Sequence, residues 1–137
     1  MALKRITNLL SWVVVMGVIG YFAYMRGWIL ADFESVSPAQ AQALLQKEGG
    51  IVLLDVRTPE EFAQERIEGA SSLPLGSLET NLPKLEPFKS KTIVVYCQSG
   101  MRSVAAARIL QRNGFKPVNL EGGIGAWESE GLPLDRR

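Results

Sequence analysis

The sequence of 137 residues contains no histidine and only one cysteine. The absence of histidine excludes Ser–His–Asp and Cys–His catalysis, and every metal site that relies on imidazole. The single cysteine, Cys97, excludes an internal disulfide, a Cys-x-x-Cys redox pair and a thiolate zinc cluster. Any reaction at Cys97 must therefore proceed without a histidine base and without a second thiol in the same chain.

An excess of charge of one sign is also missing, because 15 basic residues accompany 14 acidic ones and the formal net charge is +1. The basic residues are interspersed, and no run of them is longer than a pair such as Lys4-Arg5. Nucleic-acid binding normally needs a basic stretch or a basic helical face. We therefore expect no nucleic-acid partner.

The one long apolar segment lies near the N-terminus. Residues 6–25 carry no charged side chain, and their length matches the roughly 20 residues that a membrane-spanning helix needs. Trp12 lies toward one end and Tyr21 toward the other, as in an aromatic belt. The alternative interpretation is a cleaved signal peptide, but no Ala-x-Ala pattern follows the apolar run. We expect residues 1–30 to form a transmembrane anchor and residues 31–137 to form one further domain.

Flanking charges predict the orientation of this anchor. Lys4 and Arg5 precede the apolar segment, whereas Arg26 follows it closely and Asp32 and Glu34 lie beyond. The basic excess favours a cytoplasmic N-terminus by a margin of one or two charges. The expectation is a single-pass protein of the bacterial inner membrane with its domain in the periplasm.

From residue 35 onward, helix and strand patterns alternate. Ser37-Pro38 and Thr58-Pro59 each combine a helix N-cap with proline at the first helical position. Residues 92–96 form an uninterrupted, mostly β-branched run that predicts a strand. Further strands are expected at 51–55, 70–75 and 118–120, and further helices at 104–113 and 124–130. This alternation implies an α/β domain with a mainly parallel central sheet.

Cys97 directly follows the run 92–96 and begins a loop that leads into a helix. In open α/β sheets, ligands bind at the carboxyl ends of strands, beside helix N-termini. The N–H groups of a tight loop, the helix dipole and a nearby arginine all favour the thiolate form of a cysteine there. We therefore interpret Cys97 as the catalytic nucleophile. The expected substrate-binding loop comprises Gln98, Ser99, Gly100, Met101, Arg102 and Ser103.

The alternative for Cys97 is a small, buried apolar residue without chemistry, which is the usual role of a lone cysteine. The composition of the loop argues against that role. A glycine, an arginine and a serine within six residues are poor material for a core, and they suit an anion-binding cradle. Gly100 also permits a tight curl, because glycine tolerates positive φ.

The segment Cys97-Gln-Ser-Gly-Met-Arg-Ser103 resembles the active-site loop of rhodanese domains, which often reads Cys-x-x-Gly-x-Arg followed by Ser or Thr. One departure from the family pattern is Arg66, which stands where a histidine is common at a position regarded as structural. The other similar blocks, in family order, are Asp55-Val-Arg57, Glu61-Phe62, Ile67-Glu-Gly-Ala70, Leu73-Pro74, Leu120-Glu-Gly-Gly-Ile-Gly-Ala-Trp127 and Gly131-Leu-Pro133.

The resemblance implies a rhodanese-like three-layer α/β domain preceded by one transmembrane helix. It also implies a sulfurtransferase that moves sulfane sulfur from thiosulfate or a persulfide donor through a Cys97 persulfide to a thiol acceptor. In that scheme Arg102 balances the charge of the persulfide. Asp55 and Arg57 are expected to form a structural pair, and Arg57 and Trp127 are candidates for the pocket. The resemblance implies no cofactor and no metal.

Two alternatives to a sulfurtransferase exist. The rhodanese fold is shared with phosphatases of the cell-cycle dual-specificity type, which place five residues between the cysteine and the arginine. This chain has only the four residues 98–101, so phosphatase chemistry is disfavoured. The second alternative is a membrane-tethered rhodanese-like binding module that docks a protein partner. The retained Cys97 favours the enzyme, because inactive versions typically lack that cysteine.

Overall fold

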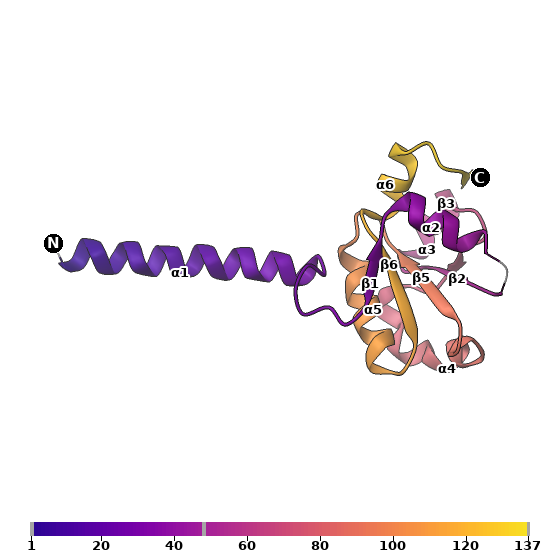
Figure 1. Ribbon diagram of the computed structural model, residues 1–137, viewed down its shortest axis with the longest axis horizontal. Coiled ribbons are helices and arrows are strands. Elements are labelled where there is room, and N and C mark those ends of the chain that lie inside the picture. The colour runs from indigo at the N-terminus through magenta and orange to yellow at the C-terminus, as the bar shows by residue number, and fades with distance from the viewer. Residues whose placement is uncertain (1, 48, 137) are drawn as a thin grey trace. The chain divides into compact units, whose positions relative to one another are not determined.

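The computed structural model describes residues 2–47 and 49–136, in two compact units that divide between Ala31 and Asp32. The first unit contains helix α1 (Ala2–Met25), which is the indigo helix in Figure 1. This helix has 24 residues and a mean hydropathy of 1.8 over its most apolar window. None of its residues is buried. It is therefore long and apolar enough to cross a membrane, a property that signal sequences share.

The second unit is built on a five-stranded sheet in the order β1-β6-β5-β2-β4. All of its neighbouring strands are parallel, as the alternation of helices and strands predicts. The strands are β1 (Glu34–Val36), β2 (Val52–Asp55), β4 (Ser71–Ser72), β5 (Thr92–Tyr96) and β6 (Lys116–Leu120).

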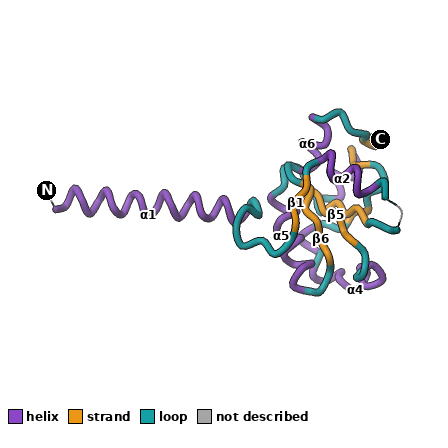
Figure 2. Tube along the Cα trace, in the orientation of Figure 1, coloured by secondary structure: helices purple, strands orange, loops and turns teal. Residues whose placement is uncertain are grey.

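Helices cover both faces of this sheet, so the unit has three layers (Figures 1 and 2). One hydrophobic cluster packs α2 (Pro38–Leu45) and α6 (Gly123–Ser129) against the sheet. The other cluster packs α4 (Leu82–Leu85) and α5 (Met101–Arg112) against the opposite face. Successive residues of β5 alternate between the clusters, with Val95 in the second and Tyr96 in the first. The predicted three-layer α/β architecture with a parallel central sheet is therefore confirmed.

Helix α3 (Pro59–Gln64) follows β2 and is fixed at its start by a capping box. Thr58 is the N-cap, its side chain accepts a hydrogen bond from the backbone N–H of Glu61, and the Glu61 carboxylate accepts one from the N–H of Thr58. Short 3₁₀ turns at residues 75–77, 79–81 and 86–88 complete the connection from β4 to β5.

A separate antiparallel pair, β3 (Glu65–Ile67) with β7 (Leu134–Arg136), lies outside the main sheet. Arg66, the departure from the family pattern, is buried in this pair. Its guanidinium donates to the Phe62 carbonyl, pairs with Asp135 at 2.9 Å and lies over the Phe62 ring. The arginine therefore has a structural role here, in keeping with the expectation for that position.

Candidate active site

Cys97 lies immediately beyond the carboxyl end of β5, and its side chain is only 1% exposed. It belongs to the cluster that packs against α5, together with Ala106 and Leu110 of that helix. The expected position at a strand end is therefore present. The sulfur lies on the face of the sheet that α5 covers.

The loop after Cys97 curls back so that one of its backbone N–H groups contacts the sulfur. The backbone N–H of Gly100 donates to Cys97 Sγ at 3.0 Å. Gly100 is the N-cap of α5 and has a φ of 106°, a conformation that a residue with a Cβ rarely adopts. Helix α5 begins at Met101, three residues before the predicted start at 104, so the sulfur contacts the amino end of a helix of 12 residues. That position favours negative charge on sulfur.

Helix α6 holds the first two peptides of the loop. The N–H of Ile124 donates to the Cys97 carbonyl at 2.8 Å, and the N–H of Gly125 donates to the Gln98 carbonyl at 3.1 Å. In a trans peptide the C=O and the following N–H point in opposite directions. The N–H groups of Gln98 and Ser99 are therefore directed away from α6. Both side chains are exposed, as expected for residues that contribute mainly backbone.

Ser103 connects the sulfur to a buried polar network that the sequence did not reveal. Cys97 Sγ lies 3.5 Å from Ser103 Oγ, which donates to Asn119 Oδ1 at 2.7 Å. Asn119 belongs to β6, is 2% exposed and donates through Nδ2 to Ser35 Oγ at 3.2 Å. Because its amide is held on both sides, Asn119 fixes the Ser103 hydroxyl beside the sulfur.

Arg102 lies in the first turn of α5, and its guanidinium is held by Glu61 of α3. Arg102 Nη1 is 2.7 Å from Glu61 Oε1, and Nη2 is 3.0 Å from Oε2. The hydrogen bond from Arg102, more than any other contact, lowers the pKa of Glu61 from 4.5 to about 2. The pKa of Arg102 is raised, first by that hydrogen bond and further by the negative charge of Glu61. Arg102 is therefore paired with Glu61, and its predicted role in balancing charge on the sulfur stays a prediction.

Arg57 forms the expected pair with Asp55. Its Nε and Nη2 contact the Asp55 carboxylate at 2.8–3.1 Å, and both side chains are at most 2% exposed. Nη2 also donates to the Glu65 carbonyl, and Nη1 reaches Gln98 Oε1 at 3.4 Å. Arg57 therefore connects β2 with β3 and touches the loop through the side chain of Gln98.

Tyr96 lies beside the Asp55–Arg57 pair. The Arg57 guanidinium lies 5.7 Å from the centre of its ring. Burial, and then the charge of Asp55, raise the pKa of Tyr96, so its hydroxyl stays protonated. The hydroxyl accepts a hydrogen bond from the N–H of Ile67. These contacts give the pair and its neighbour a structural role under the loop.

Trp127 lies on the opposite face of the sheet from Cys97. It belongs to the cluster around α2 and α6, and its indole N–H donates to the Pro133 carbonyl at 2.9 Å. It lines a cavity of about 170 Å³ together with Ile67 and Leu45. The structure thus brings Arg57 to the loop and does not bring Trp127 to the sulfur.

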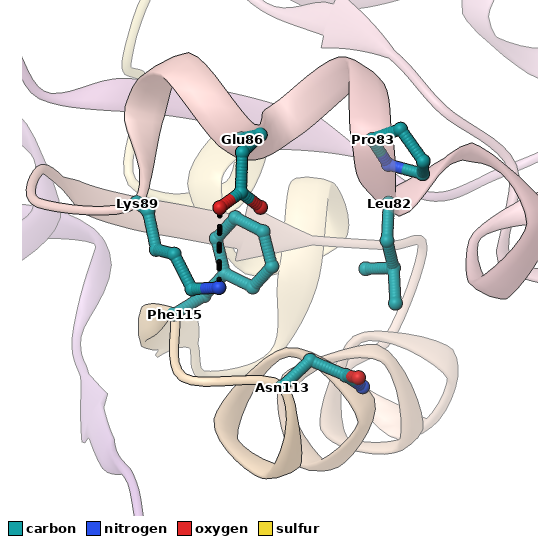
Figure 3. Close-up of a pocket in the computed structure, with 6 residues that line it drawn as sticks. All are labelled: Leu82, Pro83, Glu86, Lys89, Asn113 and Phe115. Carbon is teal, nitrogen blue, oxygen red and sulfur yellow. Dashed lines mark hydrogen bonds and ion pairs between the residues drawn. The ribbon is translucent and has the colours of Figure 1, made fainter.

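A second cavity, of about 370 Å³, also lies away from Cys97 (Figure 3). It is lined by Leu82, Pro83, Glu86, Lys89, Asn113 and Phe115. Lys89 precedes β5 and Phe115 precedes β6, so this cavity is at the amino ends of the strands, whereas Cys97 is at a carboxyl end. Within the described ranges, no group of three or more Cys, Asp or Glu side chains is placed to hold a metal ion.

The fold and the site define a parallel α/β domain with a buried cysteine at a strand end, whose loop directs a backbone N–H at the sulfur. The comparison with known families then identifies it: residues 37–130 match the rhodanese-like domain, and the chain belongs to that family. The predicted family resemblance is confirmed.

Relatives support sulfur transfer as the general activity. The chain is 38% identical to a sulfurtransferase of Allochromatium vinosum over 104 residues, which cover 75% of this chain and 91% of that protein. It is 37% identical to the thiosulfate sulfurtransferase PspE of Escherichia coli over 71 residues, or 52% of this chain and 68% of that protein. The crystal structure of a rhodanese-like domain protein from Staphylococcus aureus matches with a TM-score of 0.67 at 30% identity, covering 77% of this chain and 99% of that one.

Proposed function

We propose that the protein is a sulfurtransferase that carries sulfane sulfur as a persulfide on Cys97. The observation that supports this most strongly is the contact between Cys97 Sγ and the N–H of Gly100 at the amino end of α5. This arrangement favours a thiolate without a base, and it suits a terminal persulfide anion equally well. The sulfurtransferase relatives support the same activity.

Loading is a nucleophilic displacement at sulfur. The Cys97 thiolate attacks the outer sulfur of thiosulfate, a new S–S bond forms, and the old S–S bond breaks with its electron pair leaving on sulfite. Three negative charges enter this step and three leave, so no proton and no oxidant are needed. The N–H of Gly100 and the dipole of α5 stabilise the Cys97 persulfide, and the charge of Arg102 adds to that field.

Discharge requires an outside acceptor, because Cys97 is the only cysteine. A thiolate attacks the terminal sulfur of the persulfide, takes it as a new persulfide and returns Cys97 as the thiolate. In an assay, cyanide replaces the thiol and leaves as thiocyanate. The proposed partners are therefore a small sulfur donor and a thiol acceptor.

Intact-mass measurement of the full chain in detergent tests this function. After incubation with thiosulfate and with a small persulfide, we expect a mass gain of one sulfur atom that cyanide reverses. The Cys97→Ala variant serves as the control and should gain no mass. A wild-type chain that gains no sulfur from either donor would leave the binding module as the better description.

We also propose that α1 anchors the protein as a single pass in a bacterial inner membrane, with the domain in the periplasm. Support comes from the apolar, unburied surface of α1 and from Lys4 and Arg5 at its amino end. A reporter enzyme fused to the C-terminus and active only in the periplasm should give a signal. A signal from a cytoplasmic reporter instead would reverse the orientation.

A further inference from the structure

The carboxylate of Glu61 accepts hydrogen bonds from both terminal nitrogens of the Arg102 guanidinium. Both Nη atoms of Arg102 donate to it, at 2.7 and 3.0 Å. A guanidinium recognises a free anion best through such a pair of parallel N–H groups. An anion that approaches Cys97 therefore meets an arginine whose end-on pair of donors is already bound to a carboxylate of the protein.

The helix cap does not explain why residue 61 carries a charge. Glu61 completes the capping box of α3, but that box needs only a side-chain oxygen at its third position. Helix α2 shows this in the same chain, because its box uses Gln40 opposite Ser37 with a contact of 2.9 Å. A glutamine at 61 could also accept the hydrogen bond of the box. The negative charge of Glu61 is thus an additional feature, directed at Arg102.

The charged groups around the loop then balance one another. Arg57 is paired with the buried Asp55, and Arg102 is paired with Glu61. Thiosulfate brings two negative charges to a thiolate, which makes three negative charges in the encounter. A neutral persulfide group R–S–SH brings no charge, so its encounter with the same thiolate holds only the one negative charge of the thiolate. A balanced site suits the second encounter better, because like charges at close range repel.

From these contacts we infer that Glu61 is a specificity-determining residue, which weakens the use of free dianions such as thiosulfate relative to small persulfide donors. Glu61 does so by competing for the paired N–H groups of Arg102. This inference rests on the proposed function, since it names the class of donor that the Cys97 site prefers. Its test, however, can be made without any sulfur transfer.

The rates at which Cys97 is alkylated by a charged and by a neutral reagent test the inference directly. Iodoacetate and iodoacetamide both alkylate a thiolate with loss of iodide, and they differ in one negative charge. Cys97 is the only thiol in the chain, so the rates on the full-length protein in detergent report on this site alone. In Glu61→Gln the ratio of the iodoacetate rate to the iodoacetamide rate should rise roughly tenfold, the effect of about one nearby unit charge. An unchanged or lower ratio would overturn the inference.

Two further variants separate competition from other effects. Glu60→Gln removes the same charge from the exposed neighbouring position of α3, and it should change the ratio by less than about twofold. In an Arg102→Gln background, adding Glu61→Gln should also have an effect of less than about twofold, because Glu61 no longer holds the donors of Arg102. A full effect in that background, or an equal effect of Glu60→Gln, would refute competition for Arg102.

The donor preference is measured with the same variants. Glu61→Gln should raise kcat/KM for thiosulfate relative to cysteine persulfide, whereas wild type should favour the persulfide. Equal ratios in both proteins would contradict the assignment. If neither protein takes up sulfur, the proposed function fails, while the alkylation ratios still decide the role of Glu61.

Discussion

Arg102 and Glu61 lie on two helices, and their side chains act as one unit beside Cys97. Arg102→Ala should lower kcat/KM for thiosulfate by at least about tenfold, because the anionic transition state loses a neighbouring cation while Glu61 remains as an unpaired charge. The melting temperature should change little, because the pair is about one-third exposed and such pairs stabilise weakly. Thiosulfate:cyanide assays and thermal unfolding of both proteins test this. Equal activity in the variant would refute a role for Arg102.

At the scale of single residues, the sequence predicted the position of Cys97, but it did not predict which side chains surround its loop. The position of Cys97 after a strong strand and the glycine three residues later followed from local patterns. Glu61 could be predicted as a helix cap, but its bond to Arg102 joins residues 41 positions apart. Asn119 contacts Ser103 from a strand 16 positions away and carried no motif of its own. Side-chain partners of this kind depend on how elements pack, which local patterns do not encode.

At the scale of elements, the amino end of α6 holds the Cys97 loop through a close backbone approach. A Cβ at Gly123, whose φ is +62°, would lie within 2.7 Å of the Gln98 carbonyl group and nearer still to the Cys97 carbonyl oxygen. Gly123→Ala should therefore destabilise the fold by at least about 1 kcal/mol from its backbone conformation alone. It should also slow persulfide formation, because the loop must move.

The matched control for Gly123→Ala is Gly76→Ala. Among the described residues, no atom lies within 4 Å of the position that a Cβ at Gly76 would take, and its φ is not positive. This variant should therefore behave as wild type. Chemical unfolding followed by near-ultraviolet circular dichroism, together with sulfur uptake by mass, compares the two. A Gly123→Ala protein with unchanged stability and uptake would show that α6 does not hold the loop.

The ion pair between Glu61 of α3 and Arg102 of α5 should also make the stability depend on pH. The pKa of Glu61 is about 2 in the folded protein against an ordinary value of 4.5, so the unfolded chain binds the proton more tightly. Stability from this pair is therefore fully present above about pH 4.5 and is lost as the pH falls toward 2. The free energies of unfolding of wild type and Glu61→Gln should converge over that range. A difference that stays constant from pH 7 to pH 2 would contradict this.

Most elements of the domain followed from caps and periodicity, and the exceptions have physical reasons. Strand β5 and the capped starts of α2 and α3 agree with their patterns. Strand β4 shrinks from the expected residues 70–75 to two residues, because the chain leaves the sheet at Pro74. The β3–β7 pair was not predicted, since each strand has three residues and pairs only with a distant segment.

At the scale of the whole molecule, α1 presents apolar side chains that the described protein does not bury. Exposed apolar surface of this extent is stable in lipid and not in water. We expect the full chain to remain with membranes after alkaline extraction, and a chain that lacks residues 2–31 to be released. Fractionation with detection of the domain tests this. A shortened chain in wild-type cells, cleaved near residue 25, would instead identify α1 as a signal sequence.

The two outer strands of the main sheet, β1 and β4, have only three and two residues. Each offers few unpaired backbone groups along its free edge. Proteins confined to a bilayer meet their own copies at high density in two dimensions, and a long free edge would let neighbouring sheets join edge to edge. Under the proposed membrane anchoring, such short edges would give neighbouring copies little to pair with, so the domain could be crowded on a surface without polymerising through its sheet.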